Sequence, residues 1–549
     1  MPDTPFSIRP VRLGSLPIIR QVVEKLGIED AFLAHVNHDR RDKIPVSETL
    51  VVALLNVVTE RYPLYKMGEW ALERGVISPE MAECFTDDRV GRALDRLFYA
   101  DRAALTTQVV LNAIRVYDLE INRIHNDSTT VTLFGDYAQY EDTKAAKPKP
   151  GHNKDHRPDL KQLLFSLSVA DDGAVPLYYK VWDGNITDDT THIRNWTALR
   201  SLVGHANFIY VADCKLCVRE TMQLIHTGGG SFVTVMPQTR LEIARFRQWL
   251  DDNTPQWQDA LYLPNTRRKD GTPRVFWTYD SPFLSTEGYR IIWVKSLDKQ
   301  QDDEKRRAAR IQRTEDDLTP LSNQVHGNRN KLEKKVLATL RDNQTEEYYD
   351  WQIVRDVEES FKQQSPGRPT ATTSFKKIET EVYRLTWCQK ADRVQHDARY
   401  DGIFPLITNR HEPARQILEY YKYQPYLEKR HQQLKSVYNV APVLLKNPQR
   451  IEALLLLYFL GMLVTALIER AVRKEMKERE IDSIPIYPED RACKSPTADK
   501  LLDLFSDVRL QHICRGGRVI QTVPDALSQK QRLVLGLIGL EPESYFRDG

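Results

Sequence analysis

The chain has 549 residues, 41% of them hydrophobic and 28% charged, and its formal net charge at pH 7 is +2. This length exceeds one compact domain and predicts about three or four folding units, and the hydrophobic fraction is large enough to build buried cores. Many DNA-binding proteins are strongly basic, whereas this chain is nearly neutral. Its overall charge therefore gives no support for nucleic-acid binding. Support for such a function has to come from local groups of residues.

Cysteine use and hydropathy argue against two further classes of protein. Six cysteines in a chain of this length do not indicate a disulfide scaffold. The pair Cys214 and Cys217 lacks the two further nearby ligands of a zinc site, so we interpret it as two buried thiols at the start of a helix, with redox or metal use as the alternative. The N-terminus lacks an apolar signal core, and the longest apolar run, 453–468, is shorter than the ~18–20 residues of a membrane span. We therefore expect a soluble, cytoplasmic protein with a buried core helix in that run.

Residues 1–118 are predicted to form a helical domain. Apolar residues recur at three- and four-residue spacing over 16–36 and 47–75, which is the pattern of amphipathic helices, and Ser47 resembles a residue that opens a helix. Such a domain fits DNA-end binding, dimerisation or packing, because no sharp helix-turn-helix signal separates these roles.

The pattern changes at residue 119, where extended segments begin. A Lys- and Pro-rich stretch at 141–160 predicts a long loop. The segment 161–185 predicts a hairpin whose turn contains Gly173. The strands come first and then alternate with helices, which indicates a mixed α/β unit.

The second half of the chain divides the predicted α/β unit into two parts. Strand-like pieces around a highly charged helical stretch at 299–343 predict an insertion domain at 237–400. We expect the first part of the core at 119–236, its second part at 401–475, and a helical C-terminal tail at 476–549.

Three acidic residues stand where a catalytic site would form. Asp127 and Asp213 each end an apolar strand, and ligand sites of open α/β sheets form at that edge. Glu428 lies in a stretch of good helix formers, and Lys435, two turns further on, shares its helix face. Pro425 starts or kinks this helix. A cap or turn role is the ordinary alternative for any single strand-end aspartate.

Two aspartates and a glutamate supply the hard oxygen ligands that Mg²⁺ prefers. A pair of such ions, about 3.5–4 Å apart, activates an attacking oxygen and steadies the leaving one. Phosphodiester chemistry fits this design, because most of its barrier lies in positioning and charge. The acidic set therefore predicts a site for two Mg²⁺ ions, which Mn²⁺ can replace.

The spacing around the glutamate resembles a family signature. The pattern Tyr421-x2-Gln424-x3-Glu428-x6-Lys435 is similar to the Tyr-x2-Arg-x3-Glu-x6-Lys signature of a large branch of bacterial insertion-sequence DDE transposases. The segment NDSTTVTLFGDY resembles the first-Asp motif of that family, and YVADCKL resembles its second-Asp motif. The stretch between them, with Gly184, Asn185 and Asp188, and the strand-like DGIFPLITN before the glutamate helix are also similar. The resemblance covers about 120–237 and 400–470.

The resemblance implies an α/β fold with an RNase H-like mixed-sheet core, an α/β insertion domain, a helical N-terminal domain and a helical tail. It implies an enzyme that binds terminal inverted repeats and performs metal-dependent DNA strand cleavage and strand transfer. Asp127, Asp213 and Glu428 would be catalytic residues and metal ligands, with Asp127 bridging the two ions. The partners would be double-stranded DNA at transposon ends and target, and a second copy in a synaptic homodimer. The protein would be cytoplasmic and associated with the nucleoid when bound to DNA.

The resemblance also implies DNA contacts, with one departure from the signature. Gln424 stands where the family has an arginine that contacts a phosphate, and it brings no charge; Arg430 is a candidate to compensate. The resemblance implies that Lys435 holds a DNA phosphate; the alternative is a lysine that is only solvated on its helix. It implies that Tyr421 contacts the DNA backbone; the alternative is packing within the protein. The cations of the loop would contact successive DNA phosphates, and the alternative is a run of charges that is only solvated. The predicted DNA-binding residues are Tyr421, Gln424, Arg430, Lys435, Lys154, Arg157 and Lys161.

Two other functions remain open from the sequence. One is an RNase H-like nuclease that only hydrolyses DNA. The other is a non-catalytic DNA-binding protein derived from a transposase, against which the intact set of Asp127, Asp213 and Glu428 argues.

Overall fold

The computed structural model describes residues 6–39, 41–137, 144–187, 190–265, 271–437, 445–516 and 518–547. The chain forms two compact units. Unit 1 comprises Met1–Thr234, Thr408–Arg410 and Tyr420–Gly549, and unit 2 comprises Val235–Ile407 and His411–Glu419. The predicted insertion at 237–400 falls in unit 2, whereas the N-terminal region and the tail both belong to unit 1. Asp188 of the sequence motif lies outside the described residues.

Helices from both ends of the chain build one part of unit 1. Local signals start several of them: Thr86 accepts a hydrogen bond from the backbone of Arg89, and Asp101 caps the next helix through Ala104, which satisfies amide groups at the helix N-terminus. The helices are α1 (Leu16–Lys25), α2 (Ile28–His35), α3 (Val46–Val58), α4 (Met67–Glu73), α5 (Pro79–Ala82), α6 (Asp87–Tyr99), α7 (Arg102–Tyr117), α16 (Pro448–Glu478), α17 (Ala498–Asp503), α18 (Gln529–Ile538) and α19 (Pro542–Tyr545).

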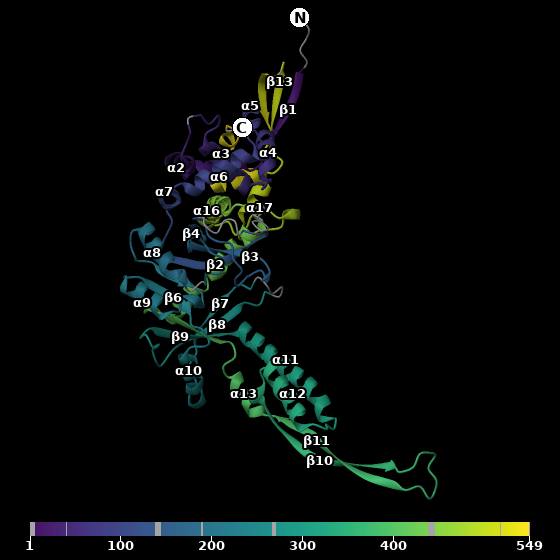
Figure 1. Cartoon of the computed structure of the whole chain (residues 1–549). Helices are drawn as coiled ribbons and strands as arrows, with labels where there is room; N and C mark the ends of the chain where they lie inside the picture. The colour runs from purple at the N-terminus through teal and green to yellow at the C-terminus, as the bar shows by residue number, and fades with distance from the viewer. Residues whose placement is uncertain are drawn as a thin grey trace. The chain divides into compact units, whose positions relative to one another are not determined.

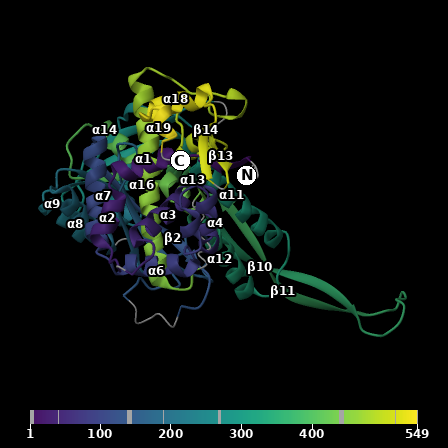
Figure 2. The same cartoon turned by 90° about the horizontal axis from the view of Figure 1, so that it is seen from above.

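The core helix of this part is α16, which contains the predicted apolar run. It packs against α1, α3, α6, α17 and α18, and the two views show it among the N-terminal helices (Figures 1 and 2). By length and composition it could cross a membrane, but 89% of its most apolar window is buried inside the structure. An apolar helix that is covered on all sides is the expected centre of a helical core.

Strands at both termini were missed by the sequence analysis. The strand β1 (Phe6–Arg12) pairs antiparallel with β13 (Arg509–Arg515), which pairs in turn with β14 (Arg518–Pro524). The beginning and the tail are mainly helical, as expected, and they carry these strands in addition. The terminal segments complete one small sheet, and such pairing depends on a partner far away in sequence.

A mixed sheet forms the other part of unit 1. Its strands lie in the order β4-β3-β2-β5-β6. The first three pair antiparallel, whereas β2, β5 and β6 run parallel. The elements are β2 (Arg123–Leu133), β3 (Lys161–Ala170), β4 (Pro176–Trp182), β5 (Ile209–Ala212) and β6 (Ser231–Val235), with the helices α8 (His192–Val203) and α9 (Arg219–Thr227).

The predicted hairpin is confirmed as β3 and β4, with Gly173 in its turn at φ +81°, a conformation that glycine adopts without strain. The first strand differs from its prediction. It does not end at Asp127 but continues to Leu133, and Ser128–Leu133 pairs along its whole length with β3. Asp127 was expected to end the strand because the segment after it is rich in threonine, whose polar side chains hide the apolar alternation.

Unit 2 contains a second group of strands and a pair of long helices. The strands lie in the order β12-β9-β8-β7, and the predicted charged stretch forms α11 and α12. An antiparallel ribbon, β10 with β11, extends past these two helices (Figure 1). The elements are α10 (Leu241–Asp252), β7 (Gln258–Leu263), β8 (Arg274–Asp280), β9 (Arg290–Ser296), α11 (Leu297–Ser322), α12 (Arg329–Asp342), η5 (Glu346–Tyr348), β10 (Tyr349–Gln363), β11 (Phe375–Gln389), α13 (Ala391–Ala398), β12 (Ile403–Thr408) and α14 (Ala414–Tyr421).

Candidate active site

Asp127 and Asp213 occupy matching positions on neighbouring parallel strands. The parallel pairing of β2 with β5 reaches His125 opposite Val211. Asp127 and Asp213 each stand two residues beyond this pair, and the backbone at Asp213 stays extended with φ −71° and ψ −173°. Because side chains alternate along a strand, both carboxylates leave the same face of the sheet at adjacent positions.

Asp213 has a local role as well as a place at the site. It follows Ala212, the last residue of β5, as predicted. Its carboxylate accepts a hydrogen bond from the backbone of Lys215 at 3.0 Å and caps a short turn, and the hydroxyl of Thr234 on β6 donates to its carbonyl oxygen. The cap interpretation is therefore confirmed, and it is compatible with a site role because a carboxylate has two oxygens that each accept hydrogen bonds.

Glu428 lies on α15 (Gln424–Gln432), a helix that packs against β2. Pro425 stands at its start, as predicted for a proline. Gln424 and His431 both contact β2 residues. With about 100° per residue, Glu428 shares their helix face. The helix therefore carries the glutamate toward the strand that bears Asp127.

Tyr421 lies within the electrostatic influence of the three candidate carboxylates. Burial raises the pKa of its phenol first, and the negative charges of Asp213, Glu428 and Asp127 raise this pKa further. The three acidic residues lie on or directly after two strands and on one helix that are far apart in sequence.

A lysine and a histidine lie next to Asp127. The Lys154 ammonium lies 3.6 Å from its carboxylate and donates to the Ser128 carbonyl oxygen, and the buried His431 ring lies 3.7 Å from its other oxygen. Lys435 contacts Asp155 at 2.5 Å, and Asp155 accepts a hydrogen bond from Thr132 of β2. Of the predicted phosphate-binding lysines, Lys154 therefore lies beside Asp127, whereas Lys435 lies next to Asp155.

The structure places Gln424 inside the protein. Its amide oxygen lies 3.2 Å from the His125 ring, its amide nitrogen donates to the Asn126 carbonyl oxygen at 3.2 Å, and 8% of the residue is exposed. A buried amide whose two ends are both used within the fold is a packing and hydrogen-bonding element. This corrects the expectation that Gln424 contacts DNA.

Arg430 is also buried, which corrects its predicted DNA contact. It forms an ion pair with Glu469 of α16 at 2.8 Å and donates to the carbonyl oxygens of Gly173 and Ala174. It therefore ties α15 to the hairpin turn and to the core helix, and it cannot compensate for the missing arginine of the signature.

Lys161, the first residue of β3, lies far from Asp127. It pairs with Leu133 at the far end of β2, six residues beyond Asp127, which corresponds to about 20 Å along a strand. Arg157 forms an exposed ion pair with Asp159, and its predicted DNA contact stays a prediction. Lys154 therefore joins the site, whereas Lys161 does not.

The fit of a metal pair can be judged from the donors. Carboxylate oxygens are the ligands that Mg²⁺ prefers, and Asp127, Asp213 and Glu428 provide them. As the side chains stand, no three histidine, cysteine or acidic side chains in the described parts of the chain are close enough to hold one ion. The donors fit the ion in type, and the ammonium of Lys154 lies 3.6 Å from the Asp127 carboxylate.

Comparisons with known proteins give limited matches. A family model described as a domain of unknown function, DUF4277, matches residues 8–111, the helical beginning of unit 1. None of the curated proteins compared matches the chain. Among solved structures, the chain is similar to the piggyBac transposase in a synaptic complex with hairpin DNA, with 9% sequence identity and a TM-score of 0.25. The alignment covers 53% of this chain and 63% of that one, so the chain spans less than two thirds of that transposase.

Two histidines lie close to Asp127, and neither was among the predicted site residues. His125 is fully buried under Tyr423, and burial lowers its pKa to about 3. His431 contacts Asp127 from the helix. A signal existed for His431, because it stands seven residues after Gln424 and so on the same helix face. The sequence offered none for the pairing of that face with β2.

Proposed function

We propose that the chain is a DNA transposase of the DDE type with an RNase H-like core. The observation that carries the proposal is the matching position of Asp127 and Asp213 on adjacent parallel strands, with Glu428 on a helix packed over the same strand. The strand order of the mixed sheet, three antiparallel strands followed by two parallel ones, supports the RNase H-like assignment.

In this proposal, Asp127, Asp213 and Glu428 hold divalent cations. When bound, Mg²⁺ or Mn²⁺ would supply the Lewis acidity that phosphodiester cleavage needs. Lys154 and Lys435 would exchange their carboxylate partners for DNA phosphates, since both contacts are partly exposed. Tyr421 would stand close to the bound DNA, since its phenol responds to the charges of all three carboxylates.

The overall reaction follows from phosphate chemistry. Water cleaves the phosphodiester at each element end and leaves a 3′-hydroxyl, and this hydroxyl then attacks a target phosphodiester and releases a target 3′-hydroxyl. The substrates would be double-stranded DNA with terminal inverted repeats and a target duplex. Two copies of the chain would hold the two ends of an element from a bacterial insertion sequence, in the cytoplasm.

The test uses the purified full-length chain with duplexes that carry the inverted repeats flanking its own reading frame. Asp213→Asn should lower strand cleavage by at least about 1,000-fold, because the site loses a ligand, while duplex binding persists. Asp503→Asn, an exposed aspartate on α17 in a surface contact with Lys500, is the matched control and should cleave normally. Cleavage retained by Asp213→Asn would falsify the assignment.

A second assay separates the proposal from a nuclease that only hydrolyses DNA. Pre-cut ends with free 3′-hydroxyls should join to a target plasmid in the presence of Mg²⁺. Hydrolysis without any joining would identify the nuclease, and binding without either reaction would identify a non-catalytic DNA-binding protein.

A further inference from the structure

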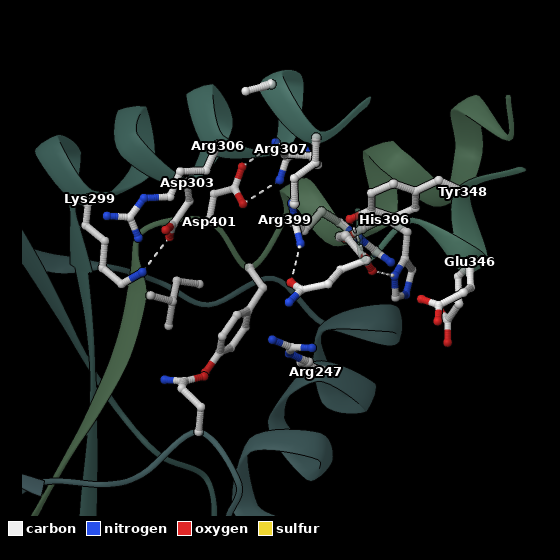
Figure 3. Close-up of a pocket in the computed structure, with 18 of the residues that line it drawn as sticks. Arg247, Lys299, Asp303, Arg306, Arg307, Glu346, Tyr348, His396, Arg399 and Asp401 are labelled. Carbon is white, nitrogen blue, oxygen red and sulfur yellow. Dashed lines mark hydrogen bonds and ion pairs between the residues drawn. The ribbon is translucent and has the colours of Figure 1, made fainter. Parts of the chain in front are cut away.

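A pocket of about 740 Å³ lies entirely within unit 2 (Figure 3). Its walls come from α10, α11, the turn before β10 and the segment that leads from α13 into β12. Seven arginine and lysine side chains and five carboxylates line it. A concave site with this many cations is unusual, because like charges repel one another when they gather.

Some of the positively charged side chains form ion pairs within the walls of the pocket. Arg307 binds Asp401 through two parallel hydrogen bonds of 2.6 and 2.5 Å, and Lys299 contacts Asp303 at 2.5 Å. The Asp303 carboxylate also accepts a hydrogen bond from the backbone of Gly402 at 3.0 Å. These contacts hold α11 against the start of β12. Because Arg307 and Lys299 are each paired with an aspartate, neither contributes an unbalanced positive charge to the pocket.

The other acidic side chains are also engaged or solvated. Asp397 accepts a hydrogen bond from the Tyr348 hydroxyl at 3.0 Å. Glu347 pairs with Arg393, which does not line the pocket. Glu346 is exposed to solvent. The carboxylates therefore do not neutralise the remaining cations.

Arg399 also has a partner, since it forms an ion pair with Asp251 at 2.8 Å. The four cations that remain are Arg306, Arg310, Arg313 and Arg247. The first three stand at positions i, i+4 and i+7 of α11, so they form one row about 10 Å long on a single helix face. Arg247 reaches the pocket from α10, on the wall opposite α11 (Figure 3), where its guanidinium lies 4.5 Å from the centre of the Tyr400 ring. Among the described residues, none of the four has a carboxylate within ion-pair distance.

Arg310 provides an independent sign of a missing ligand. It donates to the Gln344 side chain at 3.3 Å, but its Nε atom is buried and finds no acceptor in the described part of the chain. A buried donor without an acceptor is unfavourable. An acceptor-rich anion in the pocket would satisfy this donor and the guanidinium row together.

We propose that this pocket binds phosphate groups, carried either by a polynucleotide backbone or by a nucleoside polyphosphate. Guanidinium groups match phosphate oxygens through paired hydrogen bonds, and a row of about 10 Å accommodates more than one phosphate. The inference goes beyond the proposed transposase activity, because the pocket contains none of the residues assigned to cleavage.

The test compares two triple variants of the full-length chain. Arg306→Gln, Arg310→Gln and Arg313→Gln together remove the row. Lys331→Gln, Lys334→Gln and Lys335→Gln on the neighbouring α12 remove the same charge from exposed positions outside the pocket. Binding of a fluorescent DNA duplex is measured over a range of salt concentrations, and binding of inorganic triphosphate by calorimetry.

The pocket variant should lose at least about tenfold in affinity for one of the two probes, and the α12 variant should lose much less. If the phosphates belong to DNA, the slope of log affinity against log salt should fall by about 2–3 for the pocket variant, near one per phosphate contact. If they belong to a small polyphosphate, triphosphate binding should disappear while duplex binding stays unchanged.

Equal losses in the two triple variants, or no loss in either, would overturn the proposal. Unchanged circular dichroism establishes that the variants fold, and Arg313→Gln alone, an exposed position, serves as a milder second variant with a smaller loss in the same direction. Strand cleavage by Asp213→Asn and probe binding by the pocket variant are measured in separate assays, so failure of the cleavage assignment and failure of this inference give different results.

Discussion

Asp127 on β2 and Asp213 after β5 stand at the same level of two parallel strands, each two residues beyond the His125–Val211 pair. Two carboxylates at adjacent positions repel one another. Lys154 relieves this repulsion at Asp127 from a distance of 3.6 Å. A divalent cation would balance the negative charges of the two aspartates more completely than the single Lys154 does.

The first prediction concerns metal removal. EDTA should abolish DNA cleavage, and Mg²⁺ or Mn²⁺ should restore it. Because a ligand that binds only the folded state stabilises it, metal at 100 times its Kd should raise the free energy of unfolding by about 2.7 kcal/mol. Denaturation with and without Mg²⁺ measures this. Asp127→Asn should lose the increase and Asp503→Asn should keep it; an equal increase in both variants would show that the metal binds elsewhere.

The second prediction separates two residues of α15. Gln424→Leu removes the hydrogen bonds to His125 and to the Asn126 carbonyl oxygen and should lower the free energy of unfolding by about 1–3 kcal/mol, because buried polar groups lose their partners. Glu428→Gln, at an exposed position of the same helix, should leave stability within about 0.5 kcal/mol and abolish cleavage. Urea denaturation and the cleavage assay give the two values. A stable Gln424→Leu variant with weakened DNA binding would restore the DNA-contact interpretation.

The third prediction concerns the buried ion pair of Arg430 with Glu469. Arg430→Gln leaves the Glu469 carboxylate short of a partner and should lower the free energy of unfolding by about 3–5 kcal/mol, because both side chains are less than 10% exposed. The neighbouring Lys429→Gln, at an exposed position, is the control and should change stability by about 0.5 kcal/mol or less. Thermal unfolding distinguishes them. Similar melting temperatures for the two variants would contradict the clamp role of Arg430.

The fourth prediction is a pH dependence that originates at His125. Burial lowers its pKa to about 3 in the folded chain, whereas an unfolded histidine titrates near 6.5. Between these values the unfolded state binds a proton that the folded state does not. The stabilising effect is therefore complete above about pH 6.5 and is lost as pH falls, by about 1.4 kcal/mol per pH unit.

Urea denaturation at pH 7, 6 and 5 tests this dependence. The unmodified chain should be more stable than His125→Gln at pH 7, and the difference should shrink as the pH falls to 5, since the variant has no proton to bind at this position. A difference that stays constant over this range would show that His125 titrates alike in both states.

Several parts of the fold were predictable because their signals are local. The alternation of β3 and β4, the glycine of their turn, the strand before Asp213 and the buried helix α16 all depend on side chains within a few residues of one another. The end of β5 at Ala212, directly before Asp213, was predictable for the same reason, whereas the expected strand end at Asp127 was wrong because β2 runs on to Leu133.

The roles of polar helix residues were not predictable. Gln424 and Arg430 are polar residues of the kind that contact DNA from a helix face. In the structure, β2 covers Gln424, and α16 together with the hairpin turn covers Arg430. Whether a polar side chain meets water, DNA or protein depends on the elements packed around it, and its own sequence neighbourhood does not record them.

Sequence by itself determined the periodicities, the turns and the identity of the acidic residues, because backbone preference and hydrophobic spacing act over short distances. Only the tertiary structure decided that β1 pairs with β13, that β2 runs on past Asp127, that α15 lies on β2, and that four arginines of unit 2 share one pocket. Those outcomes depend on which surfaces bury one another when the chain closes on itself, and that choice is made by packing between segments far apart in sequence.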